Sequence, residues 1–164
     1  GHMRVTFEAL TTIAVLVIAP APVFAKGDTV RITITGGDLG APIEITDPAI
    51  VRQYNVWAGR GTSSGEPHSV NIDWTQGMVE PPKGVPVYEV SFVTNRGNPG
   101  TYVVRYAIDP ATKRGFVYLP GKTDAGYRDN VFLIYREVEG NWFHAWDEWE
   151  KLANPLIAKA RSTH

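Results

Sequence analysis

The chain of 164 residues contains no cysteine. This absence excludes disulfide bonds, cysteine-ligated metal centres, thiol nucleophiles and the lipid-carrying cysteine of a lipoprotein. A secreted domain of this size can build enough hydrophobic core to fold without disulfides, whereas much smaller ones rarely can. Among exported proteins, a cysteine-free chain is more typical of bacteria than of eukaryotes.

The sequence also lacks an excess of charge of either sign, because 16 Lys and Arg residues are balanced by 17 Asp and Glu residues. A near-neutral chain has no positive field to attract nucleic acids or anionic membranes, so we expect neither as a partner. The glycine spacing of nucleotide-binding loops is absent as well. Frequent Gly and Pro beside many aromatic residues favour strands joined by turns.

The first 25 residues are typical of an export signal. Gly1 and His2 precede Met3 in the manner of a cloning or protease-cleavage scar, so the native chain would begin at Met3. A basic residue, Arg4, is followed by an apolar run over residues 9–19. A basic start before a short apolar run is the order found in secretory signal peptides.

Cleavage is predicted after Ala25, because Val23 and Ala25 have the spacing that signal peptidase recognises. A membrane anchor and a buried core helix are the competing interpretations. The apolar stretch has about 17 residues with two prolines, against ~20 for a membrane span, and its β-branched residues are poor helix formers in water. We therefore expect a secreted or periplasmic protein, with no stable membrane span in a single mature domain over residues 26–164.

Alternating apolar and polar residues predict two N-terminal strands, over 30–35 and 43–46, joined as a hairpin by a glycine-rich turn. Asp47 and Pro48 have the residue types of a helix start, with Asp47 as the N-cap and Pro48 as the first helical residue. A short helix to about Tyr54 is expected to follow.

A meander of strands is predicted in the second half of the chain, because apolar and aromatic residues alternate between short turns. In chain order, strands are expected over 85–94, 101–108, 116–119, 131–136 and 142–145. Residues 55–84 show no consistent pattern, apart from an exposed Gly- and Ser-rich loop over 59–67.

Amphipathic spacing from Trp149 onward predicts a C-terminal helix that lies on the sheet. Asp147 and Glu150 have the positions of a capping box at its start, and Pro155 predicts a kink or a division into two helices. The whole pattern predicts the α+β class: an antiparallel β-sheet, made of an N-terminal hairpin and a central meander, packed by a C-terminal α-helix.

Two histidines outside the scar and the C-terminus carry the catalytic possibilities. His68 follows the 59–67 loop and lies near Asp73, so a His–Asp pair for proton transfer is conceivable. The alternative is a surface histidine near a solvated acid. His144 shares one face of its strand with Trp142 and is expected at an edge or facing solvent rather than binding a metal. We predict no metal site and no cofactor.

Tryptophans are concentrated near the C-terminus, at Trp142, Trp146 and Trp149. Exposed indoles can stack on sugar rings, so Trp142, His144 and Trp146 are the candidate ligand-binding residues. Tryptophan at helical spacing more often clamps a helix to a sheet, which is the competing interpretation. The acids that follow Trp146 suit the positive end of a helix dipole better than the paired carboxylates of a glycosidase.

These patterns favour an exported, non-enzymatic domain that binds a protein, an envelope component or a small ligand. The candidate surface combines the 59–67 loop and His68 with the loop over 120–130. One alternative is an exported hydrolase that uses His68 with Asp73, or a pair of carboxylates distant in sequence. A second alternative is glycan binding through exposed tryptophans.

Overall fold

The structure is a computed structural model of the chain, and it describes residues 1, 27–56, 68–95, 100–127, 130 and 137–162. The expected export signal, the 59–67 loop and the strand expected over 131–136 lie outside these described residues.

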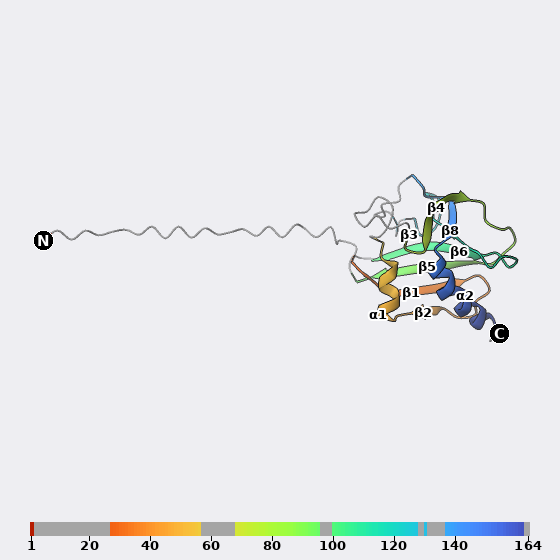
Figure 1. The fold of residues 1–164 in the computed structure, drawn as a ribbon, viewed down its shortest axis with the longest axis horizontal. Coiled ribbons are helices and arrows are strands. Elements are labelled where there is room, and N and C mark those ends of the chain that lie inside the picture. Colours follow the sequence, from red (N-terminus) through yellow and green to blue (C-terminus); the bar gives the residue numbers. More distant parts are fainter. Residues whose placement is uncertain (2–26, 57–67, 96–99, 128–129, 131–136, 163–164) are drawn as a thin grey trace.

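In the described part of the chain, eight strands form one antiparallel sheet in the order β2-β1-β5-β6-β7-β8-β4-β3. Two helices and a 3-10 turn complete the described chain (Figure 1). The elements are β1 (Thr29–Gly36), β2 (Ile43–Ile45), α1 (Pro48–Val51), η1 (Arg52–Tyr54), β3 (His68–Ser69), β4 (Ile72–Val79), β5 (Val87–Thr94), β6 (Thr101–Ile108), β7 (Gly115–Tyr118), β8 (Trp142–Ala145) and α2 (Asp147–Ser162).

The predicted α+β class is confirmed, with β1 and β2 as the N-terminal hairpin and β5, β6 and β7 as consecutive neighbours. The segment without a predicted element contains β3 and β4, which extend the sheet beyond β8. The pairing of β4 with β8 is interrupted between Asp73 and Met78. This irregularity breaks the two-residue alternation by which a strand is recognised in a sequence.

The first helix begins as the sequence predicts. The Asp47 carboxylate accepts a hydrogen bond from the Ala49 amide at 2.9 Å, and Pro48 is the first helical residue. The helix tightens into η1, which places the ring of Tyr54 in the core with 2 % of its surface exposed. Burial raises the pKa of the Tyr54 hydroxyl far above its ordinary value, and the charge of Glu148 adds to the shift.

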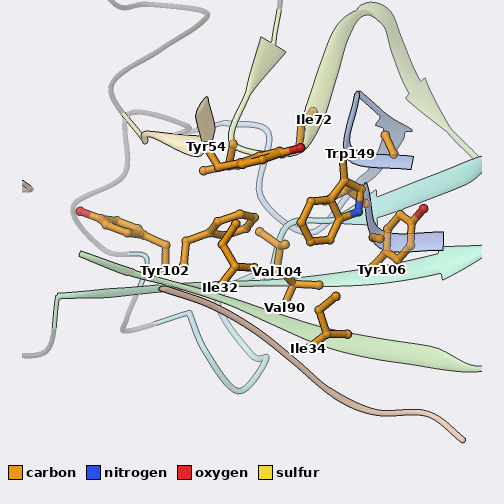
Figure 2. Packing of buried hydrophobic residues seen from close by; sticks show 14 of the residues in the cluster. Ile32, Ile34, Tyr54, Ile72, Val90, Tyr102, Val104, Tyr106 and Trp149 are labelled. Carbon is orange, nitrogen blue, oxygen red and sulfur yellow. The ribbon is translucent and has the colours of Figure 1, made fainter. Parts of the chain in front are cut away.

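The core is centred on Trp149 of α2, which is fully buried. Its ring centroid lies 5.5 Å from that of Tyr54, 5.7 Å from that of Tyr106 and 5.9 Å from that of Phe92. In Figure 2 the indole lies over Val90 and the neighbouring strand residues, between Tyr54 and Tyr106. The contacts join α2 to η1, β5 and β6, so the helix lies on the sheet as expected.

The capping box predicted at the start of α2 is wrong. Asp147 is the first helical residue and the Glu150 amide donates to the carbonyl of Trp146, so Trp146 holds the N-cap position. The Glu150 carboxylate instead accepts from the Gly115 amide at 2.9 Å and from Arg114 Nε at 3.2 Å. The hydrogen bond from the charged guanidinium of Arg114 is stronger than the neutral backbone hydrogen bond that a capping box would give Glu150. The two bonds fix α2 to the β6–β7 turn.

Pro155 does not divide the C-terminal helix, which runs from Asp147 to Ser162 as one element. Asn154, directly before the proline, accepts a hydrogen bond from the Tyr106 hydroxyl and donates to the carbonyl of Lys113 at 3.2 Å. These tertiary bonds hold the helix against the sheet at the point where its own hydrogen-bond ladder loses a donor.

The Asn130 side chain hydrogen-bonds to the backbone of β6 at Val103, beyond the part of β6 that pairs with β7. Its Oδ1 accepts from the Val103 amide at 2.8 Å, and its Nδ2 donates to the Val103 carbonyl. One side-chain amide thus replaces a strand neighbour, and Asn130 is 8 % exposed. Buried backbone groups require such partners.

Replacing Asn130 with Asp should lower the free energy of unfolding by about 3 kcal/mol near neutral pH, because a carboxylate cannot donate to the Val103 carbonyl. The deficit should shrink on acidification, since a protonated carboxyl group can donate. Urea unfolding at several pH values tests this. Asn130→Ala, which loses both bonds at every pH, is the control, and an equal pH response in both variants would contradict the role assigned to Nδ2.

Candidate functional site

The five residues singled out in the sequence lie on β3, β4 and β8 or directly after β8. His68 is the register partner of Asp73, and Asp73 is also the register partner of His144. Directly opposite residues of an antiparallel pair have neighbouring side chains on one face. His68, Asp73 and His144 therefore form a line across three strands, which we call the histidine row.

The central member of the histidine row is held by its own strand. Asp73 Oδ1 accepts from the Thr75 amide at 2.9 Å and from the Thr75 hydroxyl at 2.6 Å, and Oδ2 accepts from Gln76 Nε2 at 3.3 Å. Burial alone would raise the pKa of Asp73. The hydrogen bonds from Thr75 and Gln76, with the positive charge of His144, outweigh burial and place this pKa below its ordinary value.

His144 is not at an edge, as the sequence suggested, because β8 lies between β7 and β4. It is partly buried, and its Nδ1 has no hydrogen-bond partner in the described part of the chain. Its ring lies 5.3 Å from that of Phe116, its register partner on β7. The His144 end of the histidine row, which lies toward the centre of the sheet, therefore borders an apolar side chain.

His68 stacks flat on Trp146, with 3.6 Å between ring centroids and 9° between ring planes. Trp146 in turn meets the edge of Tyr54 at 5.5 Å. Both stacked residues are partly exposed, whereas Tyr54 and Trp149 are buried. A continuous series of rings thus connects the histidine row to the core.

The turn between β3 and β4 carries two unfavourable features. Val70 has φ of +45°, a left-handed conformation that is unusual for a β-branched residue. Asn71, the second turn residue, is fully buried, and neither Oδ1 nor Nδ2 has a partner within the described ranges. Its backbone carbonyl accepts from the Trp146 amide at 2.8 Å, so the turn touches the stacked indole. Sequence reasoning missed this turn because it contains no glycine.

A second candidate site is an open depression of about 400 Å³, within the size range of small-molecule sites. We call it the loop depression. Its lining residues are Gly121, Lys122, Thr123, Glu137, Glu139 and Gly140. Glu137 has φ of +81°, and Glu139 Oε2 is buried without a hydrogen-bond partner among the described residues.

Two glycines allow the two walls of the loop depression to approach each other. A Cβ atom on Gly121 would lie 3.1 Å from the Cα of Gly140, closer than ordinary side-chain contacts. Gly140 also has φ of +81°, which favours glycine. Gly121 donates its amide to Asp124 Oδ2 at 2.8 Å, which fixes the first wall.

Two aromatic residues lie next to these walls along the chain, Tyr118 at the end of β7 and Trp142 at the start of β8. Tyr118 and Trp142 are register partners with ring centroids 5.2 Å apart, and both are partly exposed. The Tyr118 hydroxyl donates to Asp124, and the guanidinium of Arg105 lies 5.4 Å from the Tyr118 ring centroid. Burial and the bond to Asp124 raise the pKa of the Tyr118 hydroxyl. Asp124 and Arg105 thus fix the position of the Tyr118 ring, which lies against Trp142.

One further motif lies outside the described residues. Residues 61–65 read Gly-Thr-Ser-Ser-Gly and match the Gly-x-Ser-x-Gly pattern of hydrolase nucleophile turns, with Ser63 as the serine. In those enzymes the turn leads directly into a helix. Here the next described element is the strand β3, so the structural context that would support the motif is different.

Replacing Asp73 with Asn should lower stability near pH 7 and have little effect near pH 2. The folded pKa of Asp73 lies below the unfolded value of about 3.9. Its ionised form therefore stabilises the fold above that value, and this contribution is lost as the pH falls through the folded pKa. The urea unfolding midpoints of the wild type and of Asp73→Asn, measured between pH 7 and pH 2, test the prediction. A difference that stays constant with pH would contradict it.

Within the described ranges, no three His, Asp or Glu side chains are grouped so that they could hold a metal ion. No helix in the same ranges has the length and apolar content to cross a bilayer. Comparison with protein-family models, curated proteins and solved structures found no match.

Proposed function

We propose that this protein is an exported binding domain without catalytic activity, which holds its ligand at the β3–β4 turn. One observation carries the proposal: backbone strain at Val70 and an unsatisfied buried amide at Asn71 occur side by side. Each feature costs about 1–3 kcal/mol. Stable folds tolerate such costs mainly where function requires them.

The surroundings of the turn suit a polar partner. Asn71 is fully buried, so a ligand reaches its amide only when the turn opens; a ligand group that both donates and accepts, such as a peptide or another amide, would then recover the lost hydrogen bonds. His68 and Trp146 border the turn and are partly exposed, which gives a ligand a flat aromatic surface. This combination fits a protein segment, an envelope component or a small polar ligand.

The polar side chains next to the β3–β4 turn make hydrogen bonds within the protein, and this favours binding over catalysis. Both carboxylate oxygens of Asp73 accept hydrogen bonds from Thr75 and Gln76, which hold this carboxylate to its own strand. The Ser69 hydroxyl is fully buried and accepts from Trp74 Nε1 at 2.8 Å. Export itself is supported by the sequence pattern of residues 3–25.

Replacing Asn71 with Leu tests the proposal. The change removes the buried unpaired amide at similar volume, so we expect the free energy of unfolding to rise by about 1 kcal/mol while ligand binding is lost. Thermal unfolding of the full chain, screened against peptides, sugars, metal ions and cell-envelope fragments, measures both effects. Stabilisation shifts given by the wild type should disappear in the variant.

Asn130→Leu is the matched control. Asn130 is also buried, but both of its amide atoms are bonded to Val103, so the same substitution should destabilise the fold. If Asn71→Leu destabilises as strongly as this control, the Asn71 amide has a structural role and the proposal fails. It also fails if ligand shifts persist in Asn71→Leu.

A hydrolase remains the second candidate function, favoured by the register of His68 with Asp73 and by the serine motif at residues 61–65. The binding proposal predicts that Ser63→Ala and His68→Ala leave any hydrolysis of p-nitrophenyl acetate at the level of free histidine in solution. Ester cleavage that both substitutions abolish would establish the enzyme instead.

A further inference from the structure

We propose that the loop depression is a second binding site, and that its ligand is a neutral saccharide. The proposal is independent of the β3–β4 turn. It starts from an open hollow of about 400 Å³ between residues 121–123 and 137–140. A hollow of this size can take one or two sugar rings and leave the rest of a longer glycan in solvent.

The lining groups match sugar hydroxyls, which both donate and accept hydrogen bonds. Glu137 and Glu139 provide acceptors, Lys122 provides donors, and Thr123 can do either. Glu139 Oε2 is buried and has no partner in the described chain, so it is the atom with most to gain from a hydroxyl donor. Hydrogen bonds to an ionised carboxylate are about twice as strong as neutral ones.

The aromatic pair is not part of the lining, but it adjoins both walls along the chain, where it would offer a stacking surface to a saccharide that extends out of the hollow. Tyr118 precedes the first wall and Trp142 follows the second, and both rings are partly exposed beside each other. Aromatic rings with a polar tip suit ligands that have both apolar C–H faces and hydroxyls. Arg105 and Asp124 hold Tyr118 in position before any ligand arrives, which reduces the entropy lost on binding.

The mixed charges of the lining argue against other small ligands. Two carboxylates oppose a phosphate or another anion, and the Lys122 ammonium opposes a simple cation. An apolar ligand would leave Glu139 unsatisfied. Glu137, with its strained left-handed backbone, and Glu139 both line the second wall of the loop depression, so this wall carries two carboxylates.

NMR titration of the isotope-labelled full chain tests the proposal. The probes are cellotetraose, chitotetraose and maltotetraose, with putrescine and inorganic phosphate as charged comparisons. For at least one saccharide we expect saturable shifts of the Trp142 indole N–H and of the amides of residues 121–123 and 137–140. Dissociation constants near or below about 1 mM are expected for so open a site.

Substitutions then locate the contacts. Glu139→Gln preserves shape and should raise the dissociation constant by about tenfold or more, because the charged acceptor is lost. Trp142→Ala should remove detectable binding. Asn71→Leu, at the other candidate site, should leave the titration unchanged, so this inference and the proposed function fail separately.

Three outcomes would overturn the saccharide site. The first is the absence of saturable shifts with every saccharide, and the second is shifts confined to other residues. The third is an unchanged dissociation constant in Glu139→Gln, with amide spectra showing that the variant is folded. Saturable binding of putrescine or phosphate at the loop depression without saccharide binding would assign the site to a charged ligand instead.

Discussion

The contact of the Trp149 indole with three other rings is the constraint on which the rest of the structure depends. Trp149 belongs to the last helix, whereas Tyr54, Phe92 and Tyr106 come from η1, β5 and β6. A fully buried indole contributes several kcal/mol through its area, and more through ring geometry. Its Nε1 has no partner among the described residues, so the fold accepts an unpaired donor to keep this arrangement.

Both candidate sites lie away from this centre, where the regular sheet ends. The β3–β4 turn follows the two-residue strand β3, and the loop depression lies beyond the paired ends of β7 and β8. The two sites differ in burial, because Val70 and Asn71 are fully buried, with Val70 part of the core, whereas Glu137 is exposed. The left-handed Val70 and Glu137 are found at these two places.

Much of the fold follows from sequence pattern, and most of the site does not. Strand β5 was predictable because it alternates between buried and more exposed residues, and β6 was predictable from its alternating aromatic and apolar residues although Val103 and Ala107 are buried as well. Strand β4 was hidden by the irregularity before Met78. The His68–Asp73 proximity could be foreseen, but the pairing of Asp73 with His144 depends on strand order, which local pattern does not contain. The 120–130 loop was part of the predicted binding surface and supplies one wall of the loop depression, whereas the second wall, over residues 137–140, had no local signal.

The place of Trp149 in the chain has a consequence for biosynthesis. Since the indole that completes the core belongs to α2, the strands before it lack their central contact until residue 149 has been synthesised. Domains otherwise begin to fold as they emerge from the ribosome. A core that closes only once α2 has been made stays open to a translocation channel for longer, which would suit the proposed route out of the cytoplasm.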